Sequence, residues 1–199
     1  MDGVSTATTT GSSFTISHTT SGSNLLILVG VSMTKETGGV PSVTTLTYNG
    51  VSLTLVGTQS TSDNKGRIEI WQLIAPATGT LDVVGNLSGA PDGATVGVMT
   101  FTGVNQSTPL GPFVSDLADS GSASVTVSSG ADELVFDTLA VEGSTKDLIP
   151  DAGQTERWDL FQAPAANGGA STEAGAASVV MSWTFPTDKW AIGGVSIKP

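Results

Sequence analysis

The sequence predicts an all-β protein, and more specifically a jelly-roll-type sandwich of two antiparallel sheets. Small polar residues and glycine dominate the composition, with 28 Thr, 24 Ser and 25 Gly among 199 residues. Short runs of β-forming residues recur along the chain, separated by clusters of Gly, Asn, Pro or Ser. No segment keeps the helical apolar period of about 3.6 residues beyond a turn or two. These patterns are typical of antiparallel sandwiches and barrels.

The predicted strands form two series along the chain. The first series comprises Phe14–His18, Leu25–Met33, Val43–Tyr48, Val51–Gln59, Arg67–Ile74, Leu81–Val84 and Ala94–Thr102. The second series comprises Ala123–Ser128, Glu133–Val141, Thr155–Phe161, Ser178–Phe185 and Trp190–Lys198. The residues before them are small and polar, with Val4 as the only apolar anchor. We therefore expect a flexible N-terminal arm over residues 1–13 and a single β-sandwich domain over residues 14–199.

The clearest local signal is the Asn49-Gly50 pair. Both residues tolerate the positive φ angles that a two-residue type I′ hairpin turn requires. The runs Leu25–Val31 and Glu133–Val141 are almost continuously apolar, which favours central strands covered on both faces or strands that bend between sheets. The best candidates for a short helical turn are Ser115–Asp119 and Ala163–Asn167.

The two halves of the chain resemble each other. The runs TISHTTSGSNLLILVGV and SVTVSSGADELVFDTLAV each contain a polar strand, a Ser-Gly turn and an apolar strand. Each half also ends on a Gly-Val run, VGVMTF or IGGVSI. Duplication of a Greek-key unit explains this similarity, because jelly rolls contain two Greek keys. Chance similarity between β sequences of low diversity explains it equally well.

Charge and hydropathy exclude several kinds of partner. The formal net charge is −11, with only seven Lys and Arg residues, which argues against binding to nucleic acid and to anionic membrane surfaces. No stretch approaches the ~20 apolar residues that a membrane-spanning helix needs. The first residues contain neither the basic nor the apolar region of a secretory signal. We expect no nucleic acid and no membrane as partners.

Few residues offer acid–base or nucleophilic chemistry. His18 is the only histidine, and no Ser lies in a nucleophile-elbow pattern, so we interpret His18 as a solvent-facing or hydrogen-bonded strand residue. A glycosidase needs two carboxyl groups at a fixed separation. The acids on predicted strands or loops are Glu69, Asp137, Glu142, Glu156 and Glu173. Asp137 interrupts an apolar strand, where an ion pair with Arg67 or Arg157 is the simpler explanation. We predict no catalytic residue.

No cofactor is expected, although calcium is the ion that best matches the composition. Calcium takes carboxylate and backbone oxygens as ligands. The acids in predicted loops are Asp63, Asp116, Asp119, Asp147 and Asp151. None of them belongs to a D-x-D-x-D-G run, so solvated surface acids are the simpler interpretation.

The four tryptophans give the best argument for a ligand, because an exposed indole face can stack on a sugar ring. Trp71, Trp158 and Trp190 are the candidates for a carbohydrate-binding surface. Trp183 shares an apolar face with Met181 and is expected in the core. Since aromatic residues make up only 6% of the chain, a core of this size needs most of the other tryptophans as well.

Five runs occur in order over most of residues 14–198: SHTTSGSNLLILVGVS, VTTLTYNGVSLTLVG, IEIWQLIAPATGTLDVV, FTGVNQSTPLG and ASTEAGAASVVMSWTFPTDKWAIGGVSIK. In these runs the chain resembles a recurrent jelly-roll-like β-sandwich domain of bacteriophage virion proteins and bacterial surface proteins. The resembling motifs are structural, and no catalytic residue is carried over. The resemblance implies a sandwich used for surface display, assembly or adhesion.

We therefore expect a non-catalytic structural or accessory protein of a virion, as capsid decoration or tail, or of another extracellular assembly. It would act by surface display and by association with copies of itself or with particle surface proteins. The expected location is the virion or an extracellular surface, because virion proteins are assembled in the cytoplasm without an export signal and leave by lysis. The alternative is a carbohydrate-binding or adhesive module, and an enzyme acting on polysaccharide is a third possibility.

Overall fold

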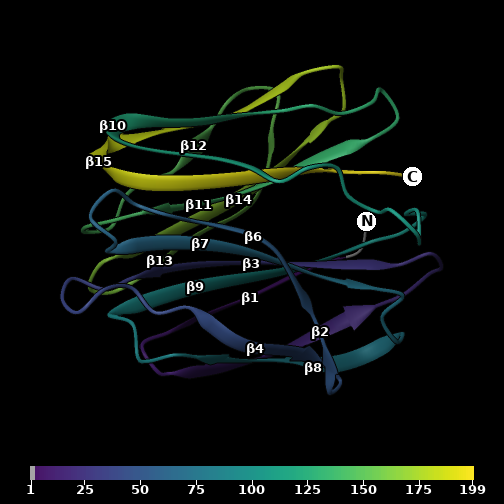
Figure 1. Cartoon of the computed structure of the whole chain (residues 1–199), viewed down its shortest axis with the longest axis horizontal. Helices are drawn as coiled ribbons and strands as arrows, with labels where there is room; N and C mark the ends of the chain where they lie inside the picture. Colours follow the sequence, from purple (N-terminus) through teal and green to yellow (C-terminus); the bar gives the residue numbers. More distant parts are fainter. Residues whose placement is uncertain (1–2) are drawn as a thin grey trace.

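The computed structural model describes residues 3–199, which fold into β-strands and their connections. Three antiparallel sheets stack on one another, with sheet A between sheets B and C (Figure 1). The all-β sandwich is confirmed, with three sheets where we expected two. No helix in this part of the chain is long and apolar enough to cross a membrane.

Strands distant in the sequence lie next to each other in every sheet. Across sheet A the order is β1 (Val4–Thr9), β9 (Gly93–Phe101), β3 (Leu26–Thr34), β7 (Gly66–Ile74) and β6 (Thr54–Ser60). Across sheet B it is β2 (Ser13–Thr20), β8 (Gly79–Leu87), β4 (Val43–Tyr48) and β5 (Val51–Ser52). Across sheet C it is β10 (Val114–Val127), β15 (Val179–Ile197), β11 (Leu134–Val141), β14 (Ala166–Ala174) and β13 (Thr155–Gln162), and β12 (Ile149–Pro150) pairs with β15. Strands β1 to β4 alternate between sheets A and B, whereas β4–β5 and β6–β7 are hairpins within one sheet, and the whole is compatible with a jelly-roll-like fold.

Sheet C folds back over itself because its two longest strands bend. The register of β10 on β15 shifts between Ser120 and Ser122. Beyond this shift, Val125 and Met181 pack in one core with Leu139 of the same sheet. The chain therefore forms two stacked sandwiches whose inner sheets face each other. We call β1–β9 the first sandwich and β10–β15 the second sandwich.

The two sandwiches have the same strand order. In the first sandwich the inner sheet has the order β1-β9-β3-β7-β6. In the second sandwich the corresponding strands, in the same order, are the first part of β10, the last part of β15, β11, β14 and β13. The bulges match as well. The register of β6 on β7 shifts between Leu55 and Gly57, and that of β13 on β14 shifts between Glu156 and Trp158. The resembling sequence runs occupy equivalent strands, which favours duplication over chance.

Both apolar runs form central strands that are covered on both faces. In β3, Ile27 and Val29 point into the core of the first sandwich, whereas Leu28 points toward the second sandwich. β11 divides its side chains in the same way, with Leu139 in its own core and Phe136 in the core between the inner sheets. A strand covered on both faces loses the apolar–polar alternation that marks a half-exposed strand.

The predicted Asn49-Gly50 turn is confirmed. The φ angles of Asn49 and Gly50 are 49° and 78°, and Tyr48 pairs with Val51 across the turn. Both residues therefore adopt the positive φ that a type I′ hairpin requires.

Some segments differ from the sequence-based expectation. Val4–Thr9, expected to belong to a flexible arm, instead forms β1 and pairs with β9 along its whole length. Met1 and Asp2 of that arm lie outside the described residues. Ser115–Asp119 lies within β10 and is not a helical turn. Ala163–Asn167 contains a turn and the start of β14, which we did not predict because its small residues have low β propensity.

Candidate functional site

The structure gives the three candidate tryptophans different environments. Trp158 is 5% exposed and Trp190 is 3% exposed. The Trp158 ring fills the space over Gly97, where an added Cβ would lie 2.5 Å from it. The Trp190 indole donates a hydrogen bond to Ser120 Oγ (3.0 Å). Neither ring presents a face on which a sugar could stack, because Trp158 packs between the inner sheets and Trp190 packs in the core of the second sandwich. Trp183 is buried, as expected.

Trp71 is the one candidate that remains partly exposed. Its indole N–H donates to Glu69 Oε2 (2.8 Å), and Arg67 Nε donates to Glu69 Oε1 (2.7 Å). The backbone N–H of Val43 also donates to Glu69 Oε1 (3.2 Å). The buried Glu69 carboxylate is thus hydrogen-bonded on both oxygens, and it fixes the orientation of the Trp71 ring.

An apolar rim surrounds Trp71 where the first sandwich opens between its two sheets. Val51 and Leu55 lie on either side of Leu53 as the chain passes from β5 of sheet B to β6 of sheet A, and Leu53 is buried in the core of the first sandwich. Leu55 pairs with Trp71 across β6 and β7. Val51 is 54% exposed and Leu55 is 40% exposed. The apolar rim comprises Val51, Leu53, Leu55, Trp71 and Leu73.

The equivalent rim of the second sandwich is polar. Glu156 pairs with Ser171 at the position where Leu55 pairs with Trp71, and both pairs immediately precede a bulge. Glu173 is the counterpart of Leu73, because Glu173 pairs with Val135 of β11 as Leu73 pairs with Ile27 of β3. Counting back along the chain from the equivalent residues Leu55 and Glu156 makes Gln154 the counterpart of Leu53 and Ala152 the counterpart of Val51. The polar rim comprises Ala152, Gln154, Glu156, Ser171 and Glu173.

Two polar groups predicted from the sequence are buried and hydrogen-bonded. His18 Nδ1 contacts Ser5 Oγ (2.9 Å) and His18 Nε2 contacts Thr100 Oγ1 (2.8 Å). Asp137 accepts hydrogen bonds from Ser171 N–H (2.7 Å), Ser171 Oγ (2.8 Å) and Trp183 Nε1 (2.7 Å). The expected ion pair of Asp137 with an arginine is wrong, because these neutral donors satisfy the carboxyl group. Burial raises the pKa of Asp137 to about 7, although its hydrogen bonds oppose that shift.

The remaining acids lie in different parts of the molecule. Glu142 is buried where the two sandwiches meet, whereas Glu156 is exposed on β13. Of the loop acids considered for calcium, Asp63 forms an ion pair with Lys189 (2.9 Å), while Asp116 and Asp119 lie on β10. Asp147 and Asp151 are exposed beside β12. Within residues 3–199, no three His, Cys, Asp or Glu side chains are placed to hold a metal ion together.

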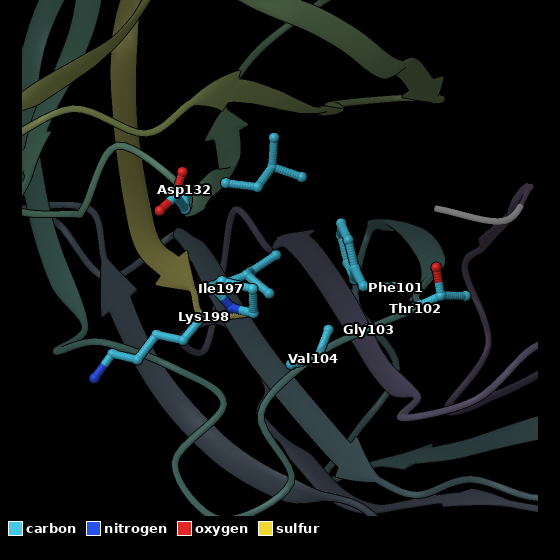
Figure 2. A pocket seen from close by; sticks show the side chains of 9 residues that line it. Phe101, Thr102, Gly103, Val104, Asp132, Ile197 and Lys198 are labelled. Carbon is cyan, nitrogen blue, oxygen red and sulfur yellow. The ribbon is translucent and has the colours of Figure 1, made fainter.

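A small cavity opens between the two sandwiches at one end of the inner sheets (Figure 2). Its volume is about 150 Å³, and its apolar lining includes Phe101, Val104 and Ile197. Asp132 and Lys198 also line it, and the Lys198 side chain points away from the apolar residues. Pockets for drug-sized ligands are typically about 300–1,000 Å³. This cavity is smaller, so we assign no ligand to it.

A larger depression of about 340 Å³ lies on the outer face of the second sandwich. Serine and threonine side chains from β10 and β15 line it together with one apolar residue and one acid of the β12 region. These outward-facing residues are Ser122, Ser124, Ile149, Asp151, Ser182 and Thr184. We call this set the hydroxyl depression.

Fold and site together define an all-β protein of two stacked sandwiches with an apolar rim on the first and a hydroxyl depression on the second. Comparison of the chain with protein-family models, with curated proteins and with solved structures found no match.

Proposed function

We propose that this protein is a non-catalytic structural or accessory component of a virion or other extracellular assembly. It works by associating with copies of itself or with the surface proteins of a particle. The observation that supports this most directly is the apolar rim of the first sandwich. The resemblance to virion and bacterial surface domains supports the same location.

The apolar rim combines two features of protein–protein contact surfaces. It presents exposed aliphatic side chains around a partly exposed tryptophan, and interface cores are enriched in aromatic residues. It also lies beside β5 and β6, the last strands of sheets B and A. Edge strands offer unpaired backbone groups to which another strand can add.

Two-fold self-association is the simplest way to bury the rim. In an isologous dimer the same patch serves both subunits, so Leu55 and Trp71 of each copy would pack against those of the other. The net charge of −11 does not prevent this contact. At physiological salt the Debye length is only about 8 Å, so repulsion between distant surface charges is screened.

Analytical ultracentrifugation of the full chain and of a Leu55→Glu variant tests the proposal. This change gives the apolar rim a glutamate at position 55, as the polar rim has at the equivalent position, Glu156. We expect the variant to associate at least about fivefold more weakly, because loss of a central contact residue costs more than about 1 kcal/mol. Its unfolding transition should change little, because Leu55 is exposed.

Phe161→Ser is the matched control. Phe161 is also an exposed large apolar residue, but it lies on β13 of the second sandwich, and Ser60 is its counterpart in the first. Association should survive this change. A full-length protein that stays monomeric at every concentration and binds no particle protein would contradict the proposal.

A carbohydrate-binding module is the second candidate function, and the hydroxyl depression is the observation that favours it. Hydroxyl groups and the Asp151 carboxylate can hydrogen-bond to sugar hydroxyls, and the exposed Ile149 can pack on the apolar face of a ring. Titration with neutral glucose, galactose and N-acetylglucosamine oligosaccharides tests this. Binding that is lost in Ser182→Val, which introduces the equivalent residue Val84 of the first sandwich, would support it.

A further inference from the structure

The chain contains two Asn-Gly dipeptides, and the fold places them in opposite environments. Asn49-Gly50 forms the exposed turn between β4 and β5, whereas Asn167-Gly168 is buried within β14. An asparagine followed by glycine loses its side-chain amide more readily than other asparagines, because no side chain keeps the next backbone nitrogen away from the amide carbon. The surroundings of each dipeptide therefore decide which one reacts.

Little holds the Asn49-Gly50 dipeptide in place. Among the described residues, no hydrogen bond restrains the Asn49 side chain or the Gly50 N–H. An added Cβ on Gly50 would meet nothing within 4 Å. The strand that follows, β5, has two exposed residues, and it pairs with β4 at only two positions. The turn can therefore rearrange, and water can enter, without displacing a packed side chain.

The Asn167-Gly168 dipeptide is held firmly. Asn167 Oδ1 accepts a hydrogen bond from the backbone N–H of Lys146 (2.8 Å). Its Nδ2 donates to three backbone carbonyl groups at 3.1–3.3 Å, those of Val141, Gly143 and Ser144. Gly168 packs against Ser32 and Thr95 of the facing sheet. The amide of Asn167 can react only after these hydrogen bonds break and the inner sheets separate.

We propose that Asn49 is a site of spontaneous deamidation. The Gly50 nitrogen attacks Cγ of Asn49 and forms a new N–C bond, which closes a succinimide ring. The Cγ–Nδ2 bond breaks, and ammonia leaves with the proton that the Gly50 nitrogen loses. One water molecule then opens the ring at either carbonyl group and yields aspartate or isoaspartate. Each product carries one carboxylate in place of the neutral amide.

This reaction changes the charge and the geometry beside the apolar rim, and its effect there rests on the proposed function. Val51 of the rim directly follows Gly50, and the backbone N–H of Asn49 donates to the carbonyl group of the exposed Asp82 (2.9 Å). The new carboxylate therefore lies near an acid and next to a surface that must lose water on contact. Isoaspartate also adds one carbon to the backbone of a two-residue turn, which disturbs the pairing of Tyr48 with Val51. Association should therefore weaken as the protein ages.

Peptide mass spectrometry of the full folded chain, after incubation in mildly alkaline buffer, tests the site. Trypsin releases residues 36–65 and 158–189, which carry Asn49 and Asn167 respectively. We expect the deamidated fraction at Asn49 to exceed that at Asn167 by at least about tenfold, because hydrogen bonds hold the second amide. Asn64 is an internal control in the first peptide, since it is also exposed but Lys65 follows it.

The chain unfolded in guanidinium is the matched control, since both Asn-Gly dipeptides should then react at similar rates. Two results would overturn the proposal. One is a folded chain in which Asn49 keeps its amide while the unfolded chain loses it. The other is a folded chain in which Asn167 reacts as fast as Asn49.

Sedimentation of fresh and incubated protein tests the effect on the rim. Incubation should weaken wild-type association by about two- to fivefold, the effect of one partly exposed charge. Asn49→Gly should associate and show no such loss, because Gly-Gly also suits a type I′ turn and carries no amide. Equal losses in both proteins would contradict an effect of Asn49 on the rim. A fresh protein that is monomeric would contradict the proposed function instead, and the peptide masses would still decide whether Asn49 deamidates.

Discussion

The first and second sandwiches share a framework of strands but differ in the residues at their open edges. Equivalent strands, registers and bulges recur in both, whereas the rim around Trp71 is apolar and the rim around Ser171 is polar. Positions covered by sheets on both sides must stay apolar or small, so burial restricts them. Edge positions carry no such restriction. The two rims can therefore differ without any change in the fold.

The cores of the two sandwiches differ in which strand of an equivalent pair carries the large residue and which carries the small one. In the first sandwich, the ring of Phe14 fills the space over Gly85, its partner across β2 and β8. In the second, the large residue lies on the other strand, where Trp183 pairs with Ala123. Such exchanges keep the total volume of a core, which is what close packing requires.

The contact between the inner sheets shows the same exchange. Trp158 of β13 covers Gly97, whereas its counterpart Gly57 of β6 leaves room for Phe113, which covers Gly193. Both rings come from the second half of the chain, Trp158 from β13 and Phe113 from the position just before β10.

The largest effect is expected from Trp158→Ala. This change empties the space over Gly97 between the inner sheets and should lower the free energy of unfolding by about 3–5 kcal/mol. Guanidinium unfolding followed by circular dichroism measures it. A loss below about 1 kcal/mol would show that the two sandwiches do not depend on this contact.

The pH dependence of stability should be set by the second sandwich. The folded pKa of Asp137 is about 7 against an ordinary value of 3.8, so the folded state holds this proton more tightly than the unfolded state. The free energy of unfolding should therefore fall as pH rises from about 4 to 7, by no more than about 4 kcal/mol, and then level off. Urea unfolding at several pH values should show a shallower slope in Asp137→Asn. An equal slope would exclude Asp137 as a source.

Gly85→Ala should destabilise the first sandwich by about 1–3 kcal/mol, because the new methyl group overlaps the Phe14 ring. Shortening that ring in the double variant Phe14→Leu, Gly85→Ala should restore part of the loss. Gly89→Ala is the control, since nothing lies within 4 Å of its added Cβ. Thermal unfolding of the three variants measures the difference, and equal losses in Gly85→Ala and Gly89→Ala would contradict the packing argument.

Gly50→Val should have the smallest effect on stability, about 1–2 kcal/mol, because a β-branched residue resists the φ of 78°. Space is not the cause, since nothing lies within 4 Å of an added Cβ there. An unchanged melting temperature would show that the turn contributes little to the first sandwich.

Val4–Thr9 forms an edge strand, contrary to the flexible arm expected from its small and polar composition. β1 completes an edge of sheet A, and Ser5 contacts the buried His18. Truncation of this segment would therefore change stability and association together, which is why single rim substitutions are the better experiment.

Most strands could be predicted because half-exposed strands alternate and turns carry Gly or Asn. The sequence could not reveal β14, because it is buried on both faces and rich in glycine and alanine, with Gly169 under Trp183 and Gly168 against Ser32 and Thr95. The candidate site was predictable only at Trp71. Val51 and Leu55 look like ordinary strand residues until the fold places them at an open edge, and burial of Trp158 and Trp190 depends on partners far away in the chain.

Hydrogen exchange of the wild-type protein at low and high concentration tests the central claim most directly, because it locates the contact surface on one sandwich or the other. We predict that protection rises with concentration at residues 51–55 and 71–73 and stays unchanged at residues 152–156 and 171–173. Protection that rises at the polar rim instead, or at neither rim, would contradict the claim that the first sandwich carries the association surface.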